Sequence, residues 1–198
     1  MSGQPHTDPT VPRARVANIA NVLTGVRLVL VPVFLVALFV GDGHETYWRI
    51  VAFIVFAAAV ITDRLDGALA RSYGMVTEFG TLADPIADKA LIGAALIGLS
   101  MLGDLPWWVT VVIMVREIGV TVLRFAVLRR GVIPASRGGK LKTLVQAVAI
   151  GLFILPLSGP WLAAAWVVMA AAVVLTVITG VDYVVSAVRD SRGRPAGH

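Results

Sequence analysis

Six apolar runs, each near 20 residues long, take up most of this 198-residue chain. They cover residues 22–40, 47–69, 80–102, 106–128, 143–158 and 161–187. At about 1.5 Å per residue, a helix of this length crosses a hydrocarbon core of roughly 30 Å. Only 15% of the residues are charged, whereas soluble domains carry roughly 25%. The sequence therefore predicts an all-α integral membrane protein with six transmembrane helices.

The two ends of the chain are polar and lie outside this bundle. We expect residues 1–15, which contain three prolines, to form a disordered cytoplasmic tail, and residues 189–198 to form a basic cytoplasmic tail. The catalytic domain then spans residues 16–188, and residues 16–21 run along the membrane surface into the first helix. The chain has no cysteine and three histidines, all in tails or a short loop. Thiol chemistry is thus excluded, and a histidine-based site is disfavoured. We also expect no nucleic-acid partner.

The basic residues lie on one side of the predicted bundle. If the N-terminus is cytoplasmic, only Arg49 of the 17 lysines and arginines lies toward the opposite side. This is the positive-inside distribution of multi-pass proteins. Four tryptophans fall at the other ends of their spans, as interfacial tryptophans do, namely Trp48, Trp107, Trp108 and Trp161.

Four aspartates border the turn between the second and third runs: Asp63, Asp66, Asp84 and Asp88. Their spacings of three and four residues put each pair on one face of a helix. A carboxylate at membrane depth costs about 2.5 to 3.5 kcal/mol, so four of them indicate function more than a solvated turn in the headgroup layer. Carboxylates without histidine or cysteine favour Mg²⁺ or Mn²⁺ bound with substrate phosphates, and four can hold two ions.

Small and basic residues accompany these aspartates. Gly67 and Ala70 leave the first helix face without bulk, so that a flat or polyanionic ligand can approach it closely. Arg71 and Lys89 add positive charge for phosphate at the rim, although headgroup contact is an equal alternative for Lys89. The pattern predicts phosphoryl transfer assisted by metal ions.

Further charges occur in the fourth span. Arg116 and Glu117 lie near its middle, and Arg124 follows two turns later. Charges within a membrane are functional candidates that face a cavity or pair with each other. For Arg116 and Glu117 the alternative is a structural ion pair.

A basic loop is predicted over residues 129–142, before the fifth span. Its segment P-A-S-R-G-G-K-L-K-T (134–143) gathers Arg137, Lys140, Lys142 and Thr143 around two glycines. Such a loop can surround a phosphate with backbone N–H groups and ammonium charges. The alternative is attraction to anionic headgroups, worth about 1 kcal/mol per basic residue.

The segment 63–88 resembles the signature of the CDP-alcohol phosphotransferases, D-x-x-D-G-x-x-A-R, eight residues, then G-x-x-x-D-x-x-x-D. Every defined position is filled, by Asp63, Asp66, Gly67, Ala70, Arg71, Gly80, Asp84 and Asp88. The resemblance implies a bundle of six transmembrane helices, a homodimer and two divalent cations, Mg²⁺ or Mn²⁺. It also implies that Asp63, Asp66 and Asp84 bind metal. Asp88 would be the general base for the acceptor hydroxyl and also contact a metal.

Three further segments resemble the members of this family that use sn-glycerol 3-phosphate as acceptor: N-I-A-N-V-L-T-G-V-R (18–27), R-E (116–117) and G-K-L-K-T (139–143). Ala20 departs from the proline that is usual there. The implied donor is CDP-diacylglycerol, and the implied location is the bacterial plasma (inner) membrane with the active site facing the cytoplasm. Donor-binding residues would be Asp63, Gly67, Ala70, Arg71, Gly80, Asn21 and Thr24. The acceptor phosphate would be bound by Arg116, Arg124, Arg137, Lys140 and Lys142.

Some alternatives remain open at this point. Asn18, Asn21, Thr24 and Arg27 would border the cavity, but a helix-entry or headgroup role suits each of them equally. A sister enzyme using inositol phosphate would share the metal site. A membrane prenyltransferase also uses aspartates with Mg²⁺ and diphosphate, but typically with more spans and on two distant loops. An ion transporter is least favoured, because no acidic groups on the outer half complete a path.

Overall fold

The computed structural model describes the backbone of residues 13–72, 78–128 and 138–192, and the side chains of residues 25–62, 89–123 and 142–186. Within these ranges the chain forms helices and turns and contains no β-strand. The elements in order are α1 (Arg13–Phe39), η1 (Val40–Gly43), α2 (Thr46–Ser72), α3 (Glu78–Met101), α4 (Trp107–Leu128), α5 (Gly138–Ile154) and α6 (Pro160–Arg192). The predicted all-helical class is therefore confirmed, with six long helices at the predicted places.

Several predicted boundaries differ from the structure. Helix α1 is continuous from Arg13 to Phe39, so residues 13–15 of the predicted disordered tail and the segment 16–21 belong to the first helix. Helix α6 continues to Arg192, beyond the predicted end of the domain at residue 188. The loop predicted over 129–142 is wrong at its C-terminal end, since α5 already begins at Gly138. Glycine is tolerated at a helix N-terminus, and the leucine and lysines that follow have high helix propensity. Lys140, Lys142 and Thr143 therefore lie in the first turns of a helix.

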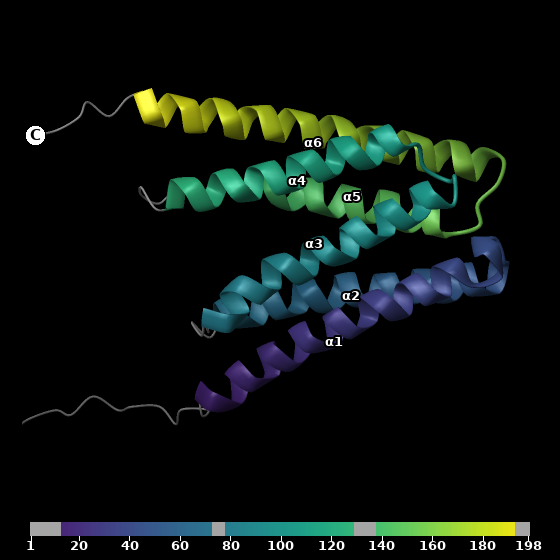
Figure 1. The fold of residues 1–198 in the computed structure, drawn as a ribbon, viewed down its shortest axis with the longest axis horizontal. Helices are drawn as coiled ribbons and strands as arrows, with labels where there is room; N and C mark the ends of the chain where they lie inside the picture. The colour runs from purple at the N-terminus through teal and green to yellow at the C-terminus, as the bar shows by residue number, and fades with distance from the viewer. Residues whose placement is uncertain (1–12, 73–77, 129–137, 193–198) are drawn as a thin grey trace, which may run out of the picture.

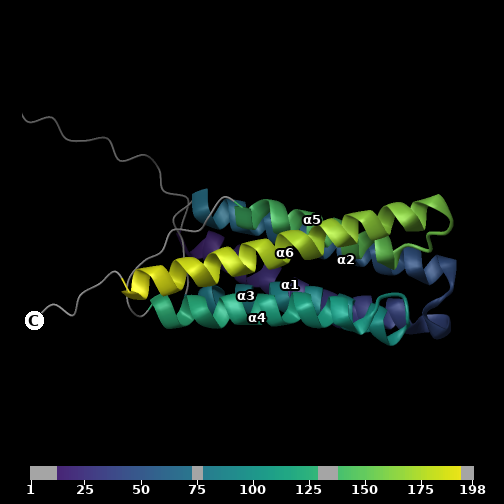
Figure 2. The same cartoon turned by 90° about the horizontal axis from the view of Figure 1, so that it is seen from above.

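The helices run along one common axis, with α1, α2 and α3 on one side of the bundle and α4, α5 and α6 on the other (Figure 1). Helix α1 packs on α2 and α3, while α6 packs on α5 and α4. Contacts of α5 with α2 and α3 join the two groups. The short connections, η1 and residues 102–106 and 155–159, all lie at one end, here called the turn end (Figure 2). The opposite end, where α2 stops at Ser72 and α3 starts at Glu78, is called the motif end.

The core is built mainly of aliphatic and phenylalanine side chains between α1, α2, α3 and α5. Phe34 of α1 and Phe56 of α2 are fully or almost fully buried, with ring centroids 5.8 Å apart. Gly98 of α3 lets α1 approach closely, because a Cβ at this position would lie 2.7 Å from Leu38 Cδ2. Removing large side chains from such a core costs roughly 2 to 5 kcal/mol each.

The outward faces of the helices are also apolar. Large hydrophobic side chains stand exposed along the bundle, among them Val36, Ile54, Val115 and Val167, each 59–70% exposed. Soluble proteins rarely expose contiguous apolar surfaces of this extent, and lipid is the solvent that suits them. Gly25–Gly43 and Pro160–Ser186 are each long and apolar enough to cross a membrane. The chain is therefore a membrane protein, and the count of six spans stays a prediction.

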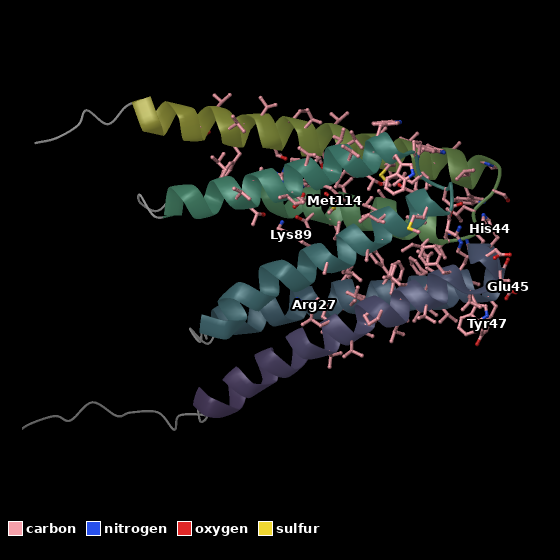
Figure 3. The ribbon with its side chains drawn as sticks, in the orientation of Figure 1. Arg27, His44, Glu45, Tyr47, Lys89 and Met114 are labelled. Carbon is pink, nitrogen blue, oxygen red and sulfur yellow. The ribbon has the colours of Figure 1, made fainter. Side chains whose placement is uncertain are left out.

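Aromatic residues gather at the turn end. Tyr47, Trp107, Trp108 and Trp161 begin their helices there and are 52–72% exposed. Tyr47 lies beside His44 and Glu45 at this end in Figure 3. Tryptophan and tyrosine favour the interface between lipid and water, so this belt agrees with the predicted membrane boundary.

Arg49 is the residue that fastens the turn end. Its side chain is about 95% buried and contacts the carboxylate of Asp104. Its Nε donates to Gly43 O at 2.5 Å, and its Nη1 donates to Phe153 O at 3.2 Å and Ile154 O at 3.4 Å. One guanidinium thus joins η1, α2, the turn before α4 and the last carbonyls of α5, which no helical N–H can satisfy.

Candidate active site

The aspartate positions lie where the sequence predicts them, on two helices that meet at the motif end. Positions 63 and 66 belong to the last turns of α2, and positions 84 and 88 belong to the first turns of α3. The two helices contact each other and are joined through residues 73–77. This backbone arrangement brings the two segments that carry the aspartates to the same end of the bundle. A set of carboxylates at that place suits a hard divalent cation.

Most of the predicted ligand groups lie outside the described side chains, so their assignments stay predictions. This holds for Asn21, Thr24, Asp63, Asp66, Gly67, Ala70, Arg71, Gly80, Asp84, Asp88, Arg124, Arg137 and Lys140. Arg27 is described and is 1% exposed (Figure 3). Its burial argues against a headgroup role, and its predicted place beside the cavity stays a prediction.

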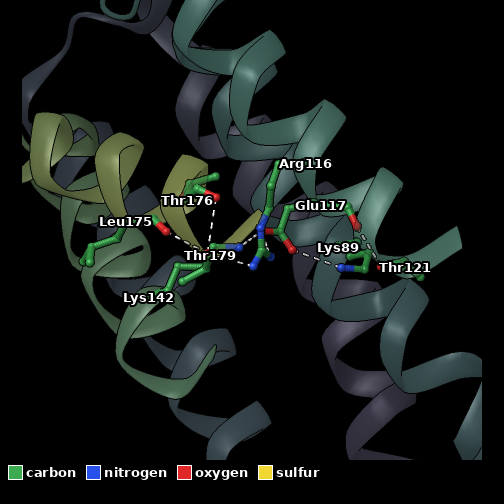
Figure 4. Close-up of polar contacts among 8 residues, drawn as sticks. All are labelled: Lys89, Arg116, Glu117, Thr121, Lys142, Leu175, Thr176 and Thr179. Atoms are coloured by element: carbon green, nitrogen blue, oxygen red, sulfur yellow. Dashed lines mark hydrogen bonds and ion pairs between the residues drawn. The ribbon is translucent and has the colours of Figure 1, made fainter. Parts of the chain in front are cut away.

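Glu117 of α4 is the centre of a polar cluster in the middle of the bundle (Figure 4). Its Oε2 accepts a hydrogen bond from Lys89 Nζ of α3 at 3.1 Å. Its Oε1 accepts one from Arg116 Nη1 at 3.2 Å and also contacts Lys142 Nζ of α5. The Glu117 side chain is 17% exposed and that of Lys142 only 3%. One cation from each of the helices α3, α4 and α5 thus contacts the Glu117 carboxylate.

Arg116 is held from its other side by α6. Its Nη2 donates to Thr179 Oγ1 at 2.9 Å, and this hydroxyl donates to Leu175 O at 2.7 Å. Gly180 lies against the stem of Arg116, since a Cβ at Gly180 would lie 3.0 Å from Arg116 Cγ. The ion pair weighed for Arg116 and Glu117 is present, but it is one part of a larger network.

A small pocket opens beside Glu117, with a volume of about 40 Å³. It is lined by residues of α3, α4 and α5, namely Lys89, Ile92, Met114, Glu117, Ile118, Thr143 and Gln146. Ile92 follows position 88 by one helical turn, so the pocket lies on the side of α3 that also carries position 88. This volume exceeds the roughly 10 to 15 Å³ that a single water molecule requires. Gln146 is 3% exposed, and its Oε1 has no hydrogen-bond partner among the described residues.

Sequence reasoning did not single out Gln146 or Thr179. Both are polar positions in runs that are otherwise apolar, and Gln146 lies four residues after Lys142, on the same helix face. That spacing was an available signal for Gln146. Thr179 carried no comparable signal, because its contact with Arg116 joins residues 63 positions apart.

The chain is similar to known proteins over nearly its whole length. The family model for CDP-alcohol phosphatidyltransferases matches residues 17–178. A probable phosphatidylglycerophosphate synthase of Mycobacterium tuberculosis is 71% identical, with 98% of this chain and 92% of the relative covered. The CDP-diacylglycerol–glycerol-3-phosphate 3-phosphatidyltransferase of Bacillus subtilis is 36% identical, with 84% and 93% covered. The chain belongs to the CDP-alcohol phosphatidyltransferase family.

Proposed function

We propose that this enzyme transfers the phosphatidyl group of CDP-diacylglycerol to sn-glycerol 3-phosphate, giving phosphatidylglycerophosphate and CMP. One observation carries the choice of acceptor: Lys89, Arg116 and Lys142 converge from three helices beside the face that carries position 88. A phosphorylated acceptor can form charge-assisted hydrogen bonds with these cations. A neutral alcohol can form only weaker, neutral hydrogen bonds with them.

Members of this family depend on divalent cations. In our proposal Asp63, Asp66, Asp84 and Asp88 hold two such ions, Mg²⁺ or Mn²⁺, between the ends of α2 and α3. Bound there, the ions would neutralise the diphosphate of the donor and polarise its P–O bonds. Gly67, Ala70 and Gly80 leave room for the donor, Asn21 and Thr24 border it, and Arg71 offsets the charge of the departing CMP.

Asp88 acts on the acceptor. Its carboxylate takes the proton of the attacking glycerol hydroxyl, and that oxygen forms a bond to the lipid-side phosphorus of the donor. The bond from this phosphorus to the oxygen of CMP breaks, and CMP leaves with the electron pair. A positioned general base contributes about 10²- to 10⁴-fold to such a step.

The acceptor phosphate is bound by basic residues of α4, α5 and the segment between them. Arg116 and Lys142 lie in the described cluster, and Arg124, Arg137 and Lys140 belong to the same proposed set. Arg116 is anchored on α6, because its Nη2 donates to Thr179 Oγ1 at 2.9 Å. A guanidinium that keeps its place can bind phosphate with less loss of conformational entropy.

We further propose the arrangement in the cell. The protein spans the bacterial inner membrane six times as a homodimer, with the motif end in the cytoplasmic half. The acceptor then enters from the cytoplasm, and the lipid donor enters sideways from the bilayer.

The test is CMP release by purified protein supplied with CDP-diacylglycerol and a panel of acceptors. We expect glycerol 3-phosphate to support turnover at least tenfold better than glycerol, serine or inositol 1-phosphate. Chelation with EDTA should abolish turnover, and Mg²⁺ or Mn²⁺ should restore it. Preference for inositol 1-phosphate would reassign the acceptor, and CMP release that persists in EDTA would contradict the metal site.

A second prediction concerns the packing of Arg116 on α6. Gly180→Ala brings a Cβ to 3.0 Å from Arg116 Cγ, so the arginine stem must shift by a few tenths of an ångström. We expect the KM for glycerol 3-phosphate to rise roughly three- to tenfold, since 1.4 kcal/mol corresponds to a factor of ten. The KM for CDP-diacylglycerol should stay within about twofold.

Gly119→Ala is the matched control, because a Cβ at Gly119 meets no atom within 4 Å among the described residues. It introduces the same methyl group into α4, near the same cluster, without touching Arg116. An equal change in the acceptor KM of both variants would show that Arg116 is not displaced by the methyl group at position 180.

A further inference from the structure

The cations that the proposed function gives to the acceptor phosphate are already in contact with a carboxylate. Lys89, Arg116 and Lys142 all lie within hydrogen-bonding distance of Glu117. An acceptor phosphate that takes over the same N–H donors displaces Glu117 from them. Glu117 also lines the pocket, so it occupies the region where the acceptor would bind.

The charges of the described cluster favour such an exchange. Among the described side chains, three cations contact this one carboxylate in a site that is mostly buried. A phosphate dianion attracts the same cations more strongly than a single carboxylate does. Arg116 Nε is buried and has no hydrogen-bond partner among the described residues, so it offers one more donor. Thr179 meanwhile keeps the guanidinium in position from the α6 side.

The ion pair of Asp104 with Arg49 at the turn end is a structural contact with which Glu117 can be compared. Asp104 contacts one cation, Arg49, whose remaining donors are directed at the backbone oxygens of Gly43, Phe153 and Ile154. Glu117 instead collects side-chain cations from three helices, and only Arg116 is its sequence neighbour. A structural tie between α3, α4 and α5 needs fewer cations.

We propose that Glu117 is an internal occupant of the acceptor-phosphate site. Its carboxylate holds Lys89, Arg116 and Lys142 together before the acceptor arrives, and the phosphate then displaces it. The acceptor must therefore offer more negative charge than a carboxylate, which selects phosphorylated alcohols against neutral or singly charged ones. Glu117 acts through the cations and is a positioning residue. This inference rests on the proposed function.

The test is equilibrium binding of inorganic phosphate and of glycerol 3-phosphate to the purified full-length protein, measured by isothermal titration calorimetry. Glu117→Gln removes the competing charge and keeps the size of the side chain. We expect both anions to bind about tenfold more tightly to this variant. In CMP-release assays its KM for glycerol 3-phosphate should fall, and its kcat should also fall, because the product retains the phosphate and leaves more slowly.

Asp104→Asn is the matched control, since it makes the same chemical change in the other carboxylate–arginine contact. It should lower thermal stability and leave both anion affinities unchanged. Unchanged or weaker anion binding by folded Glu117→Gln overturns the inference. If Glu117→Gln does not fold, Glu117→Asp replaces it, because the shorter carboxylate reaches the cations less well. We expect both anions to bind this variant about two- to threefold more tightly than they bind the wild type. Unchanged or weaker binding by this variant also overturns the inference.

The same measurements separate this inference from the proposed function. Wild-type protein that releases no CMP with glycerol 3-phosphate contradicts the proposed function, whatever the anion affinities are. Wild-type turnover with glycerol 3-phosphate, together with anion binding that Glu117→Gln does not tighten, contradicts the inference alone.

Discussion

Replacing Asp88 by asparagine is expected to lower kcat about 10²- to 10⁴-fold while the bundle stays folded. Asparagine has the shape of aspartate but cannot take the proton of the acceptor hydroxyl. Position 88 lies within α3, and aspartate and asparagine have similar helix propensities, so the helix should persist. Because Asp88 is also a proposed metal ligand, the Mg²⁺ concentration needed for half-maximal rate should rise as well.

The measurement is CMP release at saturating CDP-diacylglycerol, glycerol 3-phosphate and Mg²⁺, so that weaker binding does not hide the chemical step. Asp104→Asn makes the same substitution at the turn end and should retain turnover within a few-fold of wild type. Near-wild-type kcat for folded Asp88→Asn would mean that another group is the base. A loss that excess Mg²⁺ fully restores would leave Asp88 only as a ligand.

The helices and the positions of the motif could be predicted from sequence because both are local patterns. Apolar runs gave all six helices, and spacings of three and four residues correctly put positions 63, 66, 84 and 88 in α2 and α3. The error at residues 138–142 has a local cause too. Two adjacent glycines suggested a phosphate-binding loop, whereas the residues after them have high helix propensity and begin α5.

The contacts that organise the site could not be predicted in this way. Glu117 meets Lys142 and Lys89 across 25 and 28 residues, and Arg116 meets Thr179 across 63. Which face of α4 turns toward α3, α5 and α6 depends on how the helices pack, and periodicity does not determine that. The sequence therefore identified Arg116 and Lys142 as phosphate-binding candidates and named Glu117 as an ion-pair partner to weigh for Arg116, but it did not place Glu117 against Lys89 and Lys142.

Arg49 is the clearest example of a residue whose contacts could not be predicted from sequence. Its replacement should have the largest effect on stability. The sequence showed it only as the one basic residue predicted toward the outer side. In the structure it is about 95% buried and reaches carbonyls of Phe153 and Ile154, more than 100 residues away. We expect Arg49→Met to destabilise the protein by about 3 to 5 kcal/mol, the range seen when one partner of a buried ion pair is removed.

Methionine fills similar space but leaves the Asp104 carboxylate and the last carbonyls of α5 without their donor. Unfolding by urea or heat in detergent micelles measures the loss, and Arg49→Lys should show a smaller one, because an ammonium keeps the charge but not the planar set of donors. The double variant Arg49→Met with Asp104→Leu should recover part of the stability, since no buried charge is then left unpaired. A loss below about 1 kcal/mol for Arg49→Met would mean that the turn end is held by its apolar contacts alone. The cluster around Glu117 should keep its anion affinity in every folded variant of this series, because Arg49 and Glu117 belong to separate networks at different levels of the bundle.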